Sequence, residues 1–180
     1  MLTKKIIASL KKQLQPMKKI FLLSFVLLGF LSLKAQDTIP PYKKYDGIPS
    51  FKVMRPDSSF FTTADVPQGK PFVIVYFSPT CSHCQKTANE YVARMDEMKD
   101  VFFLWVCYHS PDDMSTFAKD YNLANRSNVV IAKDVDYFFP PYYKIQSTPC
   151  IIAFDKNGKT LSVYYGGTDP ENIINLYKHY

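Results

Sequence analysis

One stretch of the chain joins a strand, a pair of cysteines and a helix, and it constrains the fold more than any other. Residues 72–77 are a continuous apolar run, which is typical of a central strand buried on both faces. Cys81 and Cys84 follow, and residues 85–98 are predicted to form a helix. Cys81 is therefore expected at the helix N-terminus, where free backbone N–H groups stabilise a thiolate, the reactive form of cysteine. Two thiols this close can form a disulfide and so exchange two electrons.

Residues 1–35 are predicted to be a secretory signal peptide. Lysines after Met17 precede a largely apolar segment at 20–33, and residues 33–35 offer a cleavage site before Gln36. The apolar segment is shorter than the roughly 20 residues of a membrane-spanning helix. Export to the periplasm is the expectation, with an uncleaved N-terminal anchor as the alternative. Met17 is a second candidate for the translation start.

The net charge of +6 belongs to this predicted leader. Seven of the 22 basic residues are lysines within residues 1–35, which contain no acidic residue. The remaining 15 basic and 16 acidic residues leave residues 36–180 with a net charge of −1, so no nucleic-acid partner is expected. Residues 36–50 are predicted to be an extended linker, and residues 51–180 a single domain that acts as a monomer.

The predicted domain alternates between strands and helices. A short hairpin is expected over 51–54 and 59–61. Further strands are predicted at 101–107, 129–131, 150–154 and 160–165, and further helices at 110–121 and from Asp169 onward. Ser110 is placed to cap its helix, with Pro111 at the first helical position. The turn at 155–158 is typical of a hairpin. This order indicates an α/β domain.

Two motifs in these elements resemble those of the thioredoxin family. They are Cys81-Ser82-His83-Cys84 after a strand and Ser147-Thr148-Pro149 before a strand. With the predicted leader and N-terminal hairpin, the chain is most similar to exported thiol-disulfide oxidoreductases of the TlpA/ResA type. The resemblance covers residues 48–180. It implies an α/β three-layer sandwich with a central mixed sheet, helices on both faces and an extra N-terminal hairpin.

The resemblance also implies roles for individual residues. Pro149 is expected to be cis and to lie against the cysteine pair, where Thr148 and Pro149 would bind substrate. Cys81 would attack a disulfide and Cys84 would resolve the mixed disulfide. A protonated His83 would stabilise the Cys81 thiolate. No cofactor or metal is expected, and the expected partners are protein thiols and disulfides together with a membrane or exported redox partner.

Three positions depart from the family pattern. Val75 stands where thioredoxins carry a buried aspartate that accepts a proton, and Thr80 stands in place of the usual tryptophan. ResA-type proteins have a glutamate inside the motif, where this chain has Ser82-His83. Proton transfer is therefore expected to differ, through water or Glu90.

Other residues with reactive or aromatic side chains are expected to be structural. Cys107 and Cys150 are predicted to be small buried hydrophobic residues, although Cys150 follows Pro149 and should lie near the cysteine pair. His109 ends a strand and is expected to cap a helix or lie on the surface. The aromatic cluster at 137–143 is expected to pack in the core and loops rather than line a substrate groove.

Two other functions compete with disulfide exchange. A Cys-x-x-Cys pair also occurs in zinc sites, and Cys81, Cys84 and His109 could hold Cu(I) as in Sco-like chaperones of the same fold. Those proteins use a longer cysteine spacing, which counts against this alternative. A peroxiredoxin-like peroxidase is the other alternative, but its signature proline is replaced by Ile74.

Overall fold

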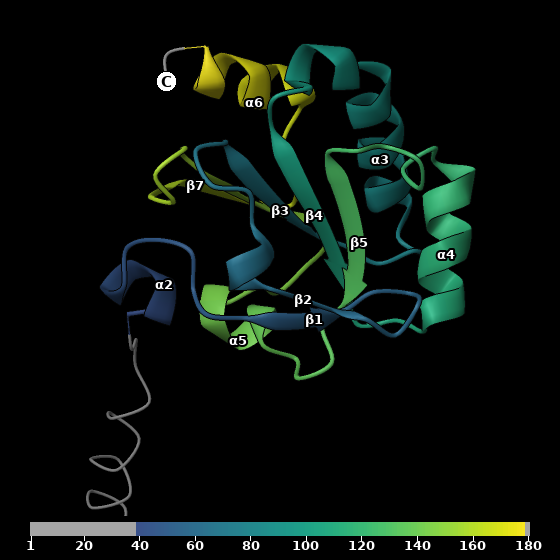
Figure 1. Ribbon diagram of the computed structural model, residues 1–180, viewed down its shortest axis with the longest axis horizontal. Helices are drawn as coiled ribbons and strands as arrows, with labels where there is room; N and C mark the ends of the chain where they lie inside the picture. The colour runs from purple at the N-terminus through teal and green to yellow at the C-terminus, as the bar shows by residue number, and fades with distance from the viewer. Residues whose placement is uncertain (1–38, 179–180) are drawn as a thin grey trace, which may run out of the picture. The chain divides into compact units, whose positions relative to one another are not determined.

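The structure, a computed structural model, describes residues 39–178. Within them seven strands form one mixed sheet in the order β2-β1-β5-β4-β3-β6-β7 (Figure 1). The strands are β1 (Lys52–Met54), β2 (Phe60–Thr62), β3 (Phe72–Tyr76), β4 (Phe102–Cys107), β5 (Val129–Lys133), β6 (Cys150–Phe154) and β7 (Thr160–Tyr165). The helices are α2 (Pro41–Lys44), α3 (Ser82–Ala93), α4 (Pro111–Asp120), α5 (Phe139–Tyr143) and α6 (Pro170–Tyr177), with 3-10 turns η2 (Thr63–Asp65) and η3 (Met95–Met98).

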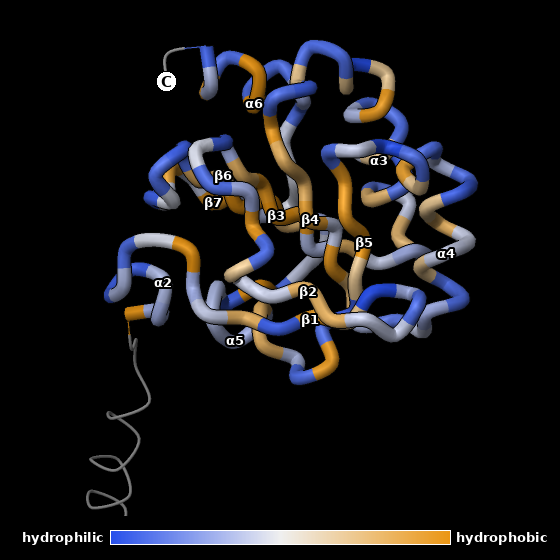
Figure 2. The backbone as a smooth tube through the Cα atoms, viewed as in Figure 1, coloured by the Kyte–Doolittle hydropathy of each residue, from blue (hydrophilic) through white to orange (hydrophobic). Residues whose placement is uncertain are grey.

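Strand β3 lies in the interior of the sheet and separates two hydrophobic clusters. It pairs in parallel with β4 and antiparallel with β6, and all five of its residues are buried. Because side chains alternate along a strand, Val73 and Val75 face the cluster formed with α3, α4 and α6. Phe72 and Ile74 face the other cluster, which includes side chains of α5. Strands β3, β4 and β5 are correspondingly coloured as hydrophobic over much of their length (Figure 2). The expected three-layer α/β sandwich is confirmed.

The expected N-terminal hairpin is also confirmed, and it extends the sheet. Val53 of β1 faces Phe61 of β2 in an antiparallel pair, and Met54 pairs with Lys133 of β5. Val53 and Phe61 are buried in the second cluster. The hairpin therefore completes the side of the sheet opposite β7.

The helix predicted over 85–98 is shorter than expected. Helix α3 ends at Ala93, and η3 follows from Met95 to Met98. Both methionines are buried, and the Val101 N–H bonds to the Met98 carbonyl just before β4. The tighter turn places two apolar side chains in the core while the chain reverses toward the sheet, an arrangement that residue periodicity alone does not predict.

Two segments in which no helix is predicted contain short helices. Residues 36–50 were predicted to be an extended linker, but from Ile39 onward the chain includes α2, and Tyr42 packs on Tyr143 with 5.3 Å between ring centroids. The prolines at 140 and 141 lie in the first turn of α5, where a missing N–H costs no intrahelical bond. Phe139 and Tyr143 of α5 are buried, whereas α2 has no buried residue and is the only helix within residues 39–50. Core packing of the aromatic cluster is confirmed for Phe139 and Tyr143, whereas Tyr137 is exposed.

The predicted signal peptide, residues 1–35, lies outside the described residues. Among residues 39–178, no helix has the length and apolar character needed to cross a membrane.

Candidate active site

The cysteine motif lies where β3 passes into α3. The Phe77 N–H still bonds to the Val106 carbonyl of β4, and a tight loop then leads to Cys81. Cys81 is the N-cap residue of α3 with an extended backbone, and its carbonyl accepts the Gln85 N–H at 3.0 Å. The predicted position of Cys81 at the helix N-terminus is confirmed.

Cys81 has the environment of a reactive thiol. Its side chain is partly exposed, and its sulfur lies 3.5 Å from the Thr148 carbonyl oxygen. Partial burial acts to raise its pKa, but the N–H and thiol of Cys84 and the N–H of His83 stabilise the thiolate, and the net pKa is lowered. The helix end therefore supplies the stabilisation that the sequence predicted.

Cys84 has the opposite environment one helical turn later. Its side chain is fully buried, and burial raises the pKa of its thiol to about 12. The backbone N–H of Ser78 lies 3.4 Å from its sulfur and acts to lower that pKa. The two thiols are thus unequal: Cys81 is partly exposed with a lowered pKa, and Cys84 is shielded with a raised pKa.

The strand pairing of β3 with β6 brings the second motif to the cysteines. Tyr76 pairs with Cys150, so the preceding residues Thr148 and Pro149 reach the loop that carries Cys81. The peptide bond between Thr148 and Pro149 is cis, as expected.

A glycine that the sequence did not single out packs directly on Pro149. Gly167 has a φ of +93°, and a Cβ there would lie 2.9 Å from the Pro149 Cγ. Any larger residue at this position would have to displace the proline ring. Only the adjacent pair Gly166-Gly167 between a strand and the last helix could have pointed to it.

A groove borders the motif between α3 and the segment that leads into α6. His83 lies on this groove with an exposed side chain, so it is the His83 N–H that acts on Cys81 in this structure. The groove is lined by His83, Lys86, Thr87, Glu90, Gly166, Gly167, Thr168, Asp169 and Asn172. It offers polar side chains and backbone beside a reactive thiol.

The structure gives Cys84 no carboxylate in the place expected for a proton acceptor. Val75 is buried in the same cluster as Cys84, and Glu90 instead pairs with Lys86 at 3.5 Å on the outer side of α3. Asp134 is a buried acid, and burial raises its pKa, but both of its oxygens accept N–H groups at the start of α5. Asp134 therefore anchors α5 rather than serving the cysteines.

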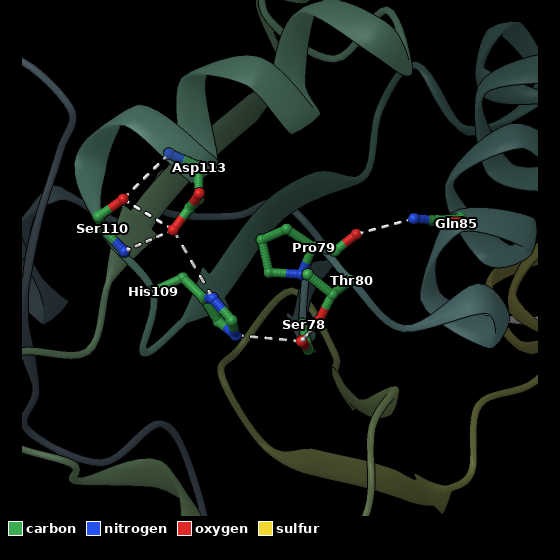
Figure 3. A network of polar contacts seen from close by, with 7 residues as sticks. All are labelled: Ser78, Pro79, Thr80, Gln85, His109, Ser110 and Asp113. Atoms are coloured by element: carbon green, nitrogen blue, oxygen red, sulfur yellow. Dashed lines mark hydrogen bonds and ion pairs between the residues drawn. The ribbon is translucent and has the colours of Figure 1, made fainter.

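His109 lies closer to the motif than expected. Its Nε2 is 3.1 Å from the Ser78 hydroxyl, and its Nδ1 is 3.8 Å from a carboxylate oxygen of Asp113 in α4 (Figure 3). The ring is partly exposed, in keeping with the expected surface position, and it also contacts the loop that precedes Cys81. The only sequence signal was its position at the end of β4, at the sheet edge where α/β folds place their sites.

Cys107 and Cys150 are buried, as expected. Both are fully buried within strands, and burial raises the pKa of each thiol to about 12. Among residues 39–178 no three His, Cys, Asp or Glu side chains gather as metal ligands. The Cu(I) ligand set of Cys81, Cys84 and His109 is therefore not assembled in this arrangement.

Comparison with solved structures supports the fold. A secreted Mycobacterium tuberculosis disulfide oxidoreductase homologous to E. coli DsbE is 19% identical, with a TM-score of 0.60 over 72% of this chain and 96% of its own. A SCO1/SenC family lipoprotein from Bacillus anthracis is 20% identical, with a TM-score of 0.59 over 74% and 94%. A peroxiredoxin-like protein from Aquifex aeolicus is 18% identical, with a TM-score of 0.61 over 81% and 89%.

At these identities the three structures share the fold and do not decide between activities. A search of curated proteins returned no match. The model of the thioredoxin-like domain family matches residues 65–180, which include both motifs and all the elements from β3 onward. The chain therefore belongs to the thioredoxin-like domain family.

Proposed function

We propose that this protein is an exported thiol-disulfide oxidoreductase that acts on protein thiols and disulfides through Cys81 and Cys84. The observation that carries the proposal is the inequality of the two thiols. Cys81 is partly exposed with a lowered pKa, whereas Cys84 is buried with a pKa raised to about 12. Exchange needs one thiol that attacks the substrate and a second that stays protonated until the mixed disulfide has formed.

The reaction consists of two exchange steps, and each step replaces one disulfide bond by another. The Cys81 thiolate attacks one sulfur of a substrate disulfide, forms a mixed disulfide and releases the other substrate sulfur as a thiolate. Cys84 then loses its proton and attacks the Cys81 sulfur, which releases the second substrate thiolate and leaves a Cys81–Cys84 disulfide. The substrate gains two electrons, and the released thiolates take protons from water. The reverse sequence oxidises a substrate dithiol.

The surroundings of Cys81 support a peptide as the substrate. Pro149 has no N–H, and the Thr148 carbonyl beside it lies 3.5 Å from the Cys81 sulfur. Thr148 and Pro149 therefore offer backbone next to the reactive thiol, and Gly167, which packs on Pro149, lines the adjoining groove along α3. An unfolded or loop segment that carries a disulfide would fit such an edge better than a compact small molecule.

Export and the redox partner belong to the same proposal. The leader at 1–35 would deliver the domain to the periplasm, with or without cleavage, and a membrane or exported redox partner would return the cysteine pair to its starting state. The oligomeric state proposed is the monomer. His83 is proposed to modulate Cys81 from the groove.

Partner trapping tests this function. The Cys84→Ser variant should accumulate mixed disulfides with exported proteins, because the intermediate has lost its internal exit. The Cys81→Ser variant is the matched control and should trap none. Titration of the wild-type protein with Cu(I) and Zn²⁺ tests the competing class. Trapping by neither variant, together with tight stoichiometric Cu(I) binding, would replace the oxidoreductase proposal with metal binding.

A further inference from the structure

The loop between β3 and Cys81 is held from two sides. The Pro79 carbonyl accepts the Gln85 side-chain amide of α3 at 2.9 Å. On the other side the Ser78 hydroxyl lies 3.1 Å from Nε2 of His109, which follows β4 (Figure 3). The Ser78 hydroxyl is also 3.2 Å from the Thr80 hydroxyl. Residues 78–80 of this loop are thereby tied to the helix that follows and to the residue that leaves the neighbouring strand.

Ser78 also connects this loop to the buried thiol. Its backbone N–H lies 3.4 Å from the Cys84 sulfur, within hydrogen-bonding range for sulfur. Ser78 thus contacts His109 through its side chain and Cys84 through its backbone. Since a thiolate is stabilised by an N–H aimed at it, the position of Ser78 bears on how readily Cys84 ionises.

His109 lies beside the first turn of α4. The Asp113 carboxylate accepts the Ser110 hydroxyl at 2.7 Å in a capping box, and the same oxygen lies 3.8 Å from Nδ1 of His109. Serine, histidine and aspartate in a row also occur in acyl-transfer enzymes, but 3.8 Å is too long for a hydrogen bond and this carboxylate is engaged with Ser110. The arrangement orients an imidazole rather than activating the Ser78 hydroxyl.

We propose that His109 is a positioning residue for Cys84, holding the Ser78 hydroxyl so that the Ser78 N–H stays aimed at the Cys84 sulfur. This inference rests on the proposed function, because it concerns the step in which Cys84 attacks Cys81. In that step a Cys84–Cys81 bond forms, the bond from Cys81 to the substrate sulfur breaks, and the substrate leaves as a thiolate. The Ser78 N–H stabilises the Cys84 thiolate during this attack. No carboxylate does so from position 75, which is a valine in this chain.

A chromogenic aryl disulfide separates the two steps without a protein substrate. The reduced protein is mixed with the reagent, and the first coloured thiolate reports attack by Cys81. The second coloured thiolate reports resolution by Cys84. We expect His109→Ala and Ser78→Ala to slow the second release about fivefold, and to change the first by less than about twofold.

Two further variants make the result specific. His109→Gln places an amide near the Nε2 position and should restore most of the resolution rate. Ser115→Ala removes a hydroxyl that bonds within α4 to the Pro111 carbonyl and should leave both steps unchanged. An unchanged second release in His109→Ala, an equal slowing of both steps, or no rescue by glutamine would overturn the positioning role. A wild-type protein that never releases the second thiolate would overturn the proposed function itself.

Discussion

The four cysteines of this chain occupy two regions with opposite properties. Cys81 and Cys84 lie at the edge of the sheet where β3 meets α3, whereas Cys107 and Cys150 lie inside strands β4 and β6. The latter two are fully buried, with the pKa of each thiol raised to about 12 by burial. Only Cys81 combines partial exposure with a lowered pKa.

The comparison shows that reactivity follows position rather than residue type. Cys84 is as buried as Cys107, yet it differs in lying one turn from Cys81 and next to the Ser78 N–H. Burial keeps Cys84 protonated until a mixed disulfide forms beside it. Cys107 and Cys150 share the burial but have no exposed cysteine one helical turn away, so they serve packing.

The largest expected effect is on activity, and it comes from substituting Cys81 rather than a cysteine inside a strand. Cys81→Ser should lower disulfide reductase activity by more than about 100-fold, because a serine hydroxyl is not ionised at neutral pH. Cys107→Ala and Cys150→Ala should keep activity while lowering the free energy of unfolding by about 1 kcal/mol each through lost packing. A turbidity assay of disulfide reduction measures the activity, and denaturant unfolding measures the free energy of unfolding. Substantial activity in Cys81→Ser would break the comparison.

A second test asks whether Cys150 takes part in exchange despite its burial. Cys84→Ser should trap mixed disulfides, and Cys84→Ser combined with Cys150→Ser should trap the same amount. The reason is that Cys150 points into the core with the aromatic cluster, away from solvent. Non-reducing gels after acid quenching measure the trapped fraction. Much greater trapping by the double variant would make Cys150 a working third thiol.

The contact between Gly167 and Pro149 predicts a smaller effect. Gly166→Ala and Gly167→Ala both place a side chain at positive φ, which costs about 1 kcal/mol of stability. Only at 167 would the new Cβ meet Pro149, while nothing lies within 4 Å at 166. We expect Gly167→Ala to lose a further 1 kcal/mol or so and several-fold in reductase rate. Equal rates in the two variants would show that Pro149 tolerates displacement.

The smallest effect is expected from His83. Its side chain is exposed, so solvent screens its charge, and its N–H survives substitution. His83→Ala should raise the pKa of Cys81 by only a few tenths of a unit. Alkylation of Cys81 followed against pH in both proteins measures the change. No change at all would remove the imidazole from the proposal.

Much of this architecture follows from the sequence alone. The apolar run at 72–77 predicted a strand buried on both faces, and the residues after it placed Cys81 at a helix N-terminus. Both features depend on residues close together in the chain, so the local sequence pattern is enough to predict them. The hairpin of β1 and β2 followed from short apolar runs around a turn in the same way.

The remaining features depend on contacts between distant residues. Helix α5 forms because Phe139 and Tyr143 are buried against the sheet, a contact that the local sequence does not reveal. Gly167 packs on Pro149, and His109 contacts Ser78 across a separation of 31 residues in the chain. No local pattern encodes these pairs, so they became visible only in the folded arrangement.

The most direct test of the central claim is the pH dependence of alkylation at each cysteine of the reduced, folded protein, with the modified sites mapped by mass spectrometry. The account predicts that Cys81 reacts far faster than the other three, with a midpoint below the free-thiol value of about 8.5. The lowered pKa of Cys81 makes it the first of the four thiols to ionise as the pH rises, whereas burial raises the pKa of Cys84, Cys107 and Cys150 to about 12. A Cys81 midpoint at or above the free-thiol value, or modification of Cys107 or Cys150 at a similar rate, would contradict it.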